Sequence, residues 1–192
     1  MALIKNTKSI CFTTVGYICS GKTSVVNKIN IPLGFNVIGE YYIINDLLNS
    51  KKHKSYSQAF LHGDINSILI EQLKIVRQLN DNIIVDQSNL TVDERNVIIE
   101  LLPEHYHIAI NVHSTLDLCR KRFYAKERNY RKSKMVNMMQ YPHYNRLKLN
   151  NFSLNPPAIS EGYSGIIHAN SRAEITHIEG SVPEILLLNP VV

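Results

Sequence analysis

The sequence predicts an α/β fold, a three-layer sandwich in which helices flank a mainly parallel β-sheet. Short apolar, β-branched runs alternate with stretches of helical period, a pattern typical of parallel strands joined by helices. A glycine-rich loop also lies between the first apolar run and the first helical stretch. With 192 residues, of which 44% are hydrophobic and 19% charged, we expect a single domain over residues 1–192.

The glycine-rich loop matches the phosphate-binding pattern G-x-x-x-x-G-K-[ST] at every fixed position. Backbone N–H groups and the N-terminus of the next helix would hold a polyphosphate. Lys22 would then reach the β- and γ-phosphates, and the Thr23 hydroxyl would bind Mg²⁺. The expected cofactors are therefore ATP and Mg²⁺, and the expected nucleotide-binding residues are Gly16, Tyr17, Ile18, Cys19, Ser20, Gly21, Lys22, Thr23 and Ser24.

Five strands and several helices are expected along the chain. Asp64 is predicted as the N-cap of the helix Ile65–Leu79, and Thr91 with Glu94 forms a capping box that begins another helix. The first helix should end before residues 31–34, which break the helical pattern. The expected strands are 9–15, 35–38, 82–86, 106–112 and a last one within 160–170, followed by an extension over 171–192 that packs on the domain.

Acidic residues follow two of these strands, at the sheet edge where ligands of parallel sheets bind. Glu40 and Asp46 come after the second strand, and either carboxylate could take a proton from a substrate hydroxyl. For Asp46 the alternative is a helix cap or a solvated side chain. Asp86 ends the third strand, where a carboxylate would act on the metal or its waters, so Thr23 and Asp86 are the expected metal-binding residues.

Positive charge is concentrated in one segment of the chain. The net charge is +5, which favours an anionic partner such as a nucleotide, a nucleic acid end or a membrane surface. We expect a basic lid over about 120–140 that closes over the phosphates, in which Arg122 and Arg128 neutralise phosphate charge. The alternative is a solvated helix face. The basic stretch 51–57 is predicted to be a surface loop, with contact to an anionic acceptor as the alternative.

Cysteine and histidine usage indicates no structural disulfide or zinc site. Cys11, Cys19 and Cys119 form no C-x-x-C pair, which is typical of a reducing compartment. His105 and His107 lie at the start of a predicted strand and are interpreted as residues of the sheet edge. The sequence has neither the apolar core of a signal peptide nor an apolar run long enough to span a membrane, so we expect a cytoplasmic protein, in the host cytoplasm if it is viral.

Taken together, these motifs resemble the phage-type 5′-hydroxyl polynucleotide kinases and the wider group of small P-loop kinases that includes the zeta toxins. The resemblance spans roughly residues 9–170 and implies a P-loop fold of the kinase type. It is carried by the glycine-rich loop, the run Asp86-Gln87-Ser88-Asn89-Leu90 with Arg95, the basic segment with Arg122, and the late motif Glu161-Gly162-Tyr163.

The resemblance also implies roles for individual residues. Asp46 would be the general base, and Arg122 and Arg128 would stabilise the transferring phosphoryl group. Acceptor binding would fall to Glu40, Asp86, Ser88, Asn89 and Arg95.

The function expected from the sequence is ATP-dependent transfer of the γ-phosphoryl group to a hydroxyl of a nucleic acid, most simply a 5′-hydroxyl end. One alternative is a nucleoside or nucleotide kinase, or a kinase of a hydroxymethylated base, for which Glu40 is the candidate base. Another is a non-catalytic ATP-binding switch. The sequence leaves open the choice between DNA and RNA and the oligomeric state.

Overall fold

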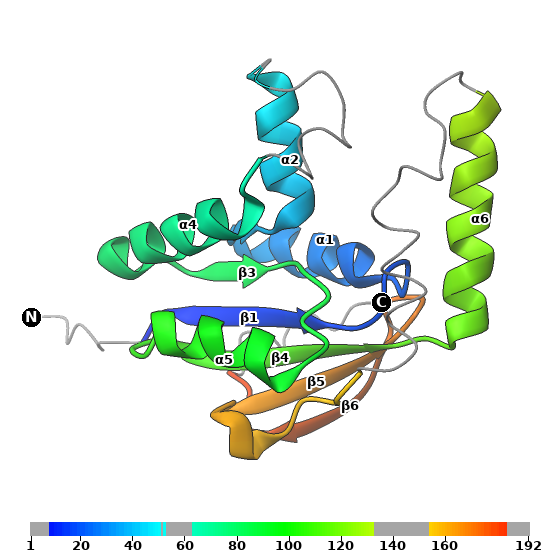
Figure 1. The fold of residues 1–192 in the computed structure, drawn as a ribbon. Coiled ribbons are helices and arrows are strands. Elements are labelled where there is room, and N and C mark those ends of the chain that lie inside the picture. The colour runs from blue at the N-terminus through cyan, green and yellow to red at the C-terminus, as the bar shows by residue number, and fades with distance from the viewer. Residues whose placement is uncertain (1–7, 51, 53–62, 133–153, 184–192) are drawn as a thin grey trace, which may run out of the picture.

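A computed structural model describes residues 8–50, 52, 63–132 and 154–183, apart from the side chains of residues 29–33 and 126–132. Six strands form one sheet in the order β2-β3-β1-β4-β5-β6 (Figure 1). The pairs from β2 to β5 are parallel, and β6 is antiparallel to β5. The strands are β1 (Ile10–Val15), β2 (Asn36–Ile38), β3 (Ile83–Val85), β4 (Tyr106–His113), β5 (Gly165–Asn170) and β6 (Ile175–Gly180).

Helices cover both faces of the sheet. Neighbouring residues of a strand point to opposite faces, so a strand that is apolar throughout packs against helices on both sides. Cys11, Ile83 and Val85 face α2, α4 and α5 on one side. Phe12, Ile84 and Ile110 face α1 on the other. The result is the expected three-layer α/β sandwich, with helices α1 (Lys22–Leu33), α2 (Glu40–Asn49), α4 (Ile65–Leu79), α5 (Val92–Leu101) and α6 (Leu116–Lys132) and a 3-10 turn η2 (Ile159–Glu161).

Two helix predictions are confirmed in detail. Helix α4 has the predicted bounds Ile65–Leu79. At the start of α5, the backbone N–H of Glu94 donates to Thr91 Oγ1 (3.2 Å), and the Glu94 carboxylate accepts from the backbone N–H of Thr91 (3.2 Å). This reciprocal pair satisfies two backbone donors that the first turn of a helix would otherwise leave unpaired.

Two predictions are corrected by the structure, and a third is confirmed in position only. Asp64 is the N-cap residue of α4, as predicted, but its φ is 45° and its side chain makes no cap hydrogen bond. Helix α1 runs through residues 31–33 and ends before Gly34, whose φ of 64° lies in the left-handed region typical of helix ends. The expected extension after residue 170 contains β6, an edge strand exposed along most of its length, so its sequence lacks the apolar alternation of a half-buried strand.

Several sequence-based expectations fall outside the described residues. They include most of the basic stretch 51–57, the segment 133–153 with the second half of the expected lid, and the apolar run at 184–188. Within the described part, none of the helices combines the length and hydrophobicity needed to cross a membrane.

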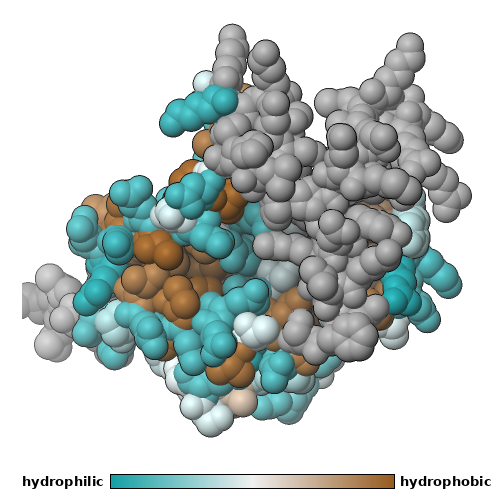
Figure 2. Space-filling view, in the orientation of Figure 1, coloured by the Kyte–Doolittle hydropathy of each residue, from teal (hydrophilic) through white to brown (hydrophobic). Residues whose placement is uncertain are grey.

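Helices α4 and α5 carry exposed apolar side chains. Ile75 and Leu79 of α4 and Val97 of α5 are 51%, 63% and 44% exposed. Figure 2 shows a hydrophobic area in the region where these two helices lie in Figure 1.

Candidate active site

The glycine loop, residues 16–23, leaves the carboxyl end of β1 and enters α1, as predicted. Gly16 and Gly21 have φ of 149° and 113°. A Cβ added to Gly16 would lie 2.8 Å from the carbonyl oxygen of Val112, and one on Gly21 would lie 2.9 Å from that of Ser171. Both glycines are therefore required by the backbone conformation and by the close approach of a second strand or turn.

Lys22 holds the loop from inside. Its ammonium donates to the carbonyl oxygens of Gly16 (2.9 Å) and Tyr17 (2.8 Å). Burial lowers the pKa of Lys22 to about 8, and the negative charges of Asp86 and, to a smaller degree, Glu40 oppose this shift. A buried cation within the glycine loop is suited to bind phosphate oxygens.

Thr23 and Asp86 bring two oxygen donors together beside the loop. The Thr23 hydroxyl donates to Asp86 Oδ2 (3.1 Å), and the Thr14 hydroxyl is 3.3 Å from Asp86 Oδ1. Burial raises the pKa of Asp86, while Lys22 and the two hydroxyls counteract the increase. A hydroxyl and a carboxylate are the hard oxygen ligands that Mg²⁺ uses beside a nucleotide, so these residues fit the expected ion.

Helix α2 begins at Glu40, directly after β2, which places this carboxylate close enough to affect the pKa of Lys22. A Cβ on the preceding residue, Gly39, would overlap the carbonyl oxygen of Asp86, so only glycine allows this approach. Asp46 lies six residues further along the same helix, about 9 Å along its axis, and is exposed. The two candidate bases are thus separated, with Glu40 on the side of the loop.

Ser88 and Asn89 contact the glycine loop and the strand before it. The backbone N–H of Gly16 donates to the carbonyl oxygen of Ser88 (3.0 Å). The Asn89 side-chain amide, 3% exposed, donates to the carbonyl oxygen of Thr14 (2.8 Å). The segment after β3 therefore holds the start of the loop in place.

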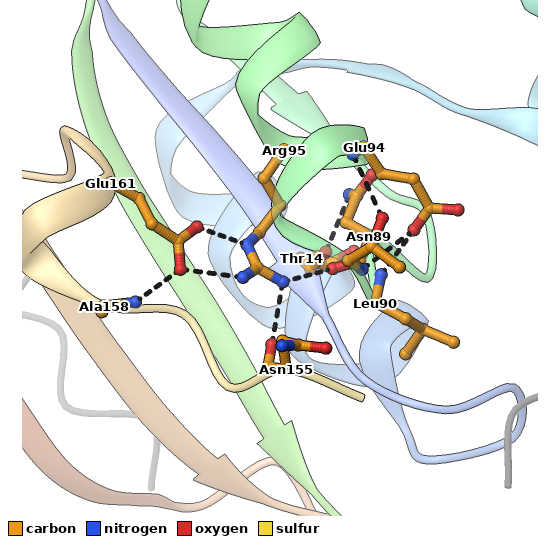
Figure 3. A network of polar contacts seen from close by, with 9 residues as sticks. Thr14, Asn89, Leu90, Glu94, Arg95, Asn155, Ala158 and Glu161 are labelled. Carbon is orange, nitrogen blue, oxygen red and sulfur yellow. Dashed lines mark hydrogen bonds and ion pairs between the residues drawn. The ribbon is translucent and has the colours of Figure 1, made fainter. Parts of the chain in front are cut away.

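Arg95 is directed toward Glu161 and Asn155 inside the fold (Figure 3), and its expected role in acceptor binding stays a prediction. Its side chain is 0% exposed. The guanidinium donates from Nε and Nη2 to the two carboxylate oxygens of Glu161 (2.7 and 2.8 Å). From Nη1 it donates to the carbonyl oxygens of Asn89 (3.0 Å) and Asn155 (2.9 Å). Arg95 and Glu161 thus connect two sequence motifs, the run 86–90 with Arg95 and the late motif 161–163, next to the backbone of Asn89.

The first half of α6 packs on the tip of the glycine loop. Cys119 and Phe123 form a buried cluster with Tyr17, Ile18 and Cys19. Arg122 donates to the carbonyl oxygens of Cys19 and Ser20 (3.2 Å each) and of Ser171 (3.0 Å). The basic segment therefore begins as a helix that is hydrogen-bonded to the loop and packed on it. The side chain of Arg128 lies outside the described part.

Comparison with known proteins agrees with this architecture. Residues 12–146 match a protein family described as an AAA domain. The chain belongs to this AAA domain family. No significant match was found among curated proteins.

Solved structures share the fold of this AAA domain protein at low sequence identity. A structure from the PezAT chromosomal toxin–antitoxin system of Streptococcus pneumoniae superposes with a TM-score of 0.63 at 14% identity, covering 98% of this chain and 82% of the other. A gluconokinase from Sinorhizobium meliloti 1021 gives 0.53 at 14% identity, covering 97% and 91%. A sugar kinase from Janibacter sp. HTCC2649 gives 0.54 at 14% identity, covering 94% and 91%. These likenesses show a shared P-loop kinase-like fold.

Three residues at the site of this AAA domain protein were missed by the sequence analysis. Thr14, in a strand predicted to be core, contacts the Asp86 side chain. Gly39, predicted only as a strand end, lies against the backbone of Asp86. Ser171, predicted as the start of an extension, lies against Gly21 and accepts a hydrogen bond from Arg122. Each partner is distant in sequence, so a local pattern could not have identified them.

Proposed function

We propose that this protein is a kinase that transfers the γ-phosphoryl group of ATP to a hydroxyl group of an acceptor. The observation that supports this is the convergence of four groups at the carboxyl edge of the sheet: the glycine loop, Lys22, the Thr23–Asp86 pair and Glu40. The loop supplies a phosphate cradle and the pair supplies ligands for Mg²⁺. A carboxylate next to them would serve as the base.

In this proposal the protein acts mainly by positioning and charge compensation. The loop N–H groups would hold the β- and γ-phosphates, and Lys22 would exchange its two carbonyl partners for phosphate oxygens. Thr23 and Asp86 would hold Mg²⁺, which neutralises phosphate charge when bound. As the acceptor oxygen bonds to the γ-phosphorus, its proton would pass to Glu40 and the bond to the β-phosphate would break, releasing ADP.

We propose Glu40, in place of Asp46, as the base. Glu40 is the first residue of α2, where the helix dipole favours a negatively charged side chain, and its charge acts on Lys22. Glu40→Gln should lower kcat by about 10²–10⁴-fold with little change in ATP affinity, because it removes proton transfer and leaves the loop intact. Asp46→Asn, the matched carboxylate-to-amide control on the same helix, should retain kcat within about 2-fold, since surface substitutions have small effects.

Steady-state kinetics with each variant would check the assignment. Loss of activity in Asp46→Asn together with an active Glu40→Gln enzyme would return the base to Asp46. Full activity in both variants would remove general-base catalysis from the proposal.

For the acceptor we propose a nucleic acid with a free hydroxyl, most simply a 5′-hydroxyl end. The net charge of +5 and the basic residues of α6, among them Arg120, Lys121 and Arg122, favour a polyanionic partner. A second candidate is a small polyhydroxy compound, because structures titled as a gluconokinase and a sugar kinase share the fold. The remaining candidate acceptors are free nucleosides or nucleotides and a hydroxymethylated base in DNA.

One assay would test the function and separate these acceptors. The protein would be incubated with γ-labelled ATP and 5′-hydroxyl DNA, 5′-hydroxyl RNA, hydroxymethylated DNA, free nucleosides and gluconate, and the labelled species identified. Labelling of oligonucleotides that requires a 5′-hydroxyl supports the nucleic acid acceptor, and a signal that weakens steeply with salt fits a phosphate-contacting surface. ATP binding without labelling of any acceptor would favour the non-catalytic switch.

A further inference from the structure

A second polar cluster lies on β4 and β5, which β1 separates in the sheet from β3, the strand that leads to Asp86. His113 Nε2 is 2.9 Å from His168 Nδ1. The side-chain amide of Asn111 is 3.2 Å from His113 Nε2 and 3.5 Å from His168 Nδ1. Three polar atoms from two adjacent strands therefore form a triangle whose edges measure 2.9, 3.5 and 3.2 Å.

The sheet register makes this triangle. Asn111 pairs with His168 across the parallel strands β4 and β5, and His113 is two residues beyond Asn111, on the same face. The three side chains are consequently held by paired backbone, which keeps their spacing without a flexible loop. Figure 1 shows the two strands running side by side.

A fourth residue sets the tautomer of His168. Glu179 of the next strand, β6, accepts a hydrogen bond from His168 Nε2 (2.9 Å). With the proton on Nε2, the lone pair on Nδ1 points into the triangle. A carboxylate that orients the far nitrogen of an imidazole is the usual outer partner of a histidine metal ligand.

We propose that His113 Nε2, His168 Nδ1 and the Asn111 side-chain oxygen bind a divalent transition metal ion, with Zn²⁺ as the reference ion. Ligands about 2.0–2.1 Å from Zn²⁺ lie about 3–3.5 Å from one another, which is close to the observed triangle. A half-turn of the Asn111 amide exchanges its nitrogen and oxygen and presents the acceptor. Two imidazoles favour zinc, nickel or copper over magnesium or calcium.

The site is open to ions from solution. His113 is exposed and the side chain of His168 is 14% exposed, so water can complete the coordination. Among the described residues, no group of three or more His, Cys, Asp or Glu side chains is placed to hold a metal. The proposed site differs because its third donor is an amide.

A metal ion here would join the carboxyl ends of β4 and β5 close to the glycine loop. Val112, between Asn111 and His113, presents the carbonyl oxygen that would lie 2.8 Å from a Cβ added to Gly16. Because an ion that binds only the folded state stabilises it, metal should raise the melting temperature. The inference does not depend on the kinase proposal.

Calorimetric titration of the chelator-treated full chain with ZnCl₂, without nucleotide, would test the site. We expect one saturable binding event and a rise in melting temperature for the wild type. His113→Ala and His168→Ala should each lose both signals. Glu179→Gln should weaken binding about 10–100-fold, as the loss of an outer partner does.

Two further variants make the result decisive. His177→Ala is the matched control, because this ring lies 5.6 Å from the ring of His168 without bonding to Asn111 or His113, and it should retain both signals. Asn111→Asp should bind Zn²⁺ more tightly, since it replaces an amide with a carboxylate of the same shape. The proposal is overturned if the wild type shows no saturable binding, if the His113 variant binds like the wild type, or if Asn111→Asp leaves affinity unchanged.

Discussion

Replacing Lys22 with Ala is expected to lower kcat/KM for phosphoryl transfer by at least about 10²–10³-fold, the typical loss when one preorganised donor to a developing charge is removed. The residue is the buried cation of the glycine loop, and its ammonium already donates to the carbonyl oxygens of Gly16 and Tyr17. Lys22→Ala should therefore also weaken ATP binding, measured by calorimetry, because the phosphates lose their nearest fixed positive charge.

The matched control for this variant is Lys28→Ala on the same helix. Lys28 also donates to a backbone carbonyl, that of Ala173 (3.3 Å), but no phosphate contact is proposed for it. Its loss should change kcat/KM by no more than about 2-fold, as expected for a substitution away from the site. Comparable losses in the two variants would mean that the loop is not the phosphate site.

The pH dependence of ATP binding offers an independent check on Lys22. Burial lowers the pKa of this residue to about 8, so the nucleotide-free protein loses the charge as the pH rises through that value. Bound phosphate favours the ammonium, so the ATP affinity of the wild type should fall as pH increases above about 8. Lys22→Ala should lack this fall, and an unchanged slope would assign it to another group.

Replacing Glu161 with Gln should lower the free energy of unfolding by about 3–5 kcal/mol, the usual cost of removing one partner from a buried ion pair. Arg95 is 0% exposed and Glu161 is 8% exposed, so water cannot replace the lost carboxylate. A protein of this kind has a total stability of only about 5–15 kcal/mol, so the effect would be large. Urea unfolding of both proteins would measure it.

Asp117→Asn provides the matched carboxylate-to-amide control. Asp117 pairs with Arg120 at 3.5 Å, but their side chains are 83% and 42% exposed, so this substitution should cost no more than about 1 kcal/mol. Replacing Arg95 and Glu161 together by Leu should recover much of the stability lost in Glu161→Gln, because no buried charge then remains unpaired. If Glu161→Gln and Asp117→Asn lowered the free energy of unfolding equally, the Arg95–Glu161 pair would not be buried in solution.

Local pattern predicted much of the fold. The strand–loop–helix order around residues 16–23, the bounds of α4 and the capping box of α5 follow from interactions within a few residues, which composition and spacing can reveal. The edge strand β6 escaped prediction because it is mostly exposed and has no apolar alternation. Its place depends on pairing with β5, a contact that a local pattern does not encode.

For the candidate site too, some features follow from the local sequence and others only from the tertiary structure. The presence of a loop able to hold phosphate was determined by the sequence itself, since its glycines, lysine and hydroxyl act at fixed short spacing. Only the tertiary structure decided that Arg95 is buried against Glu161, that Arg122 is hydrogen-bonded to the loop, and that the charge of Glu40 acts on Lys22. These outcomes depend on which strands become neighbours and on which charges lose contact with water.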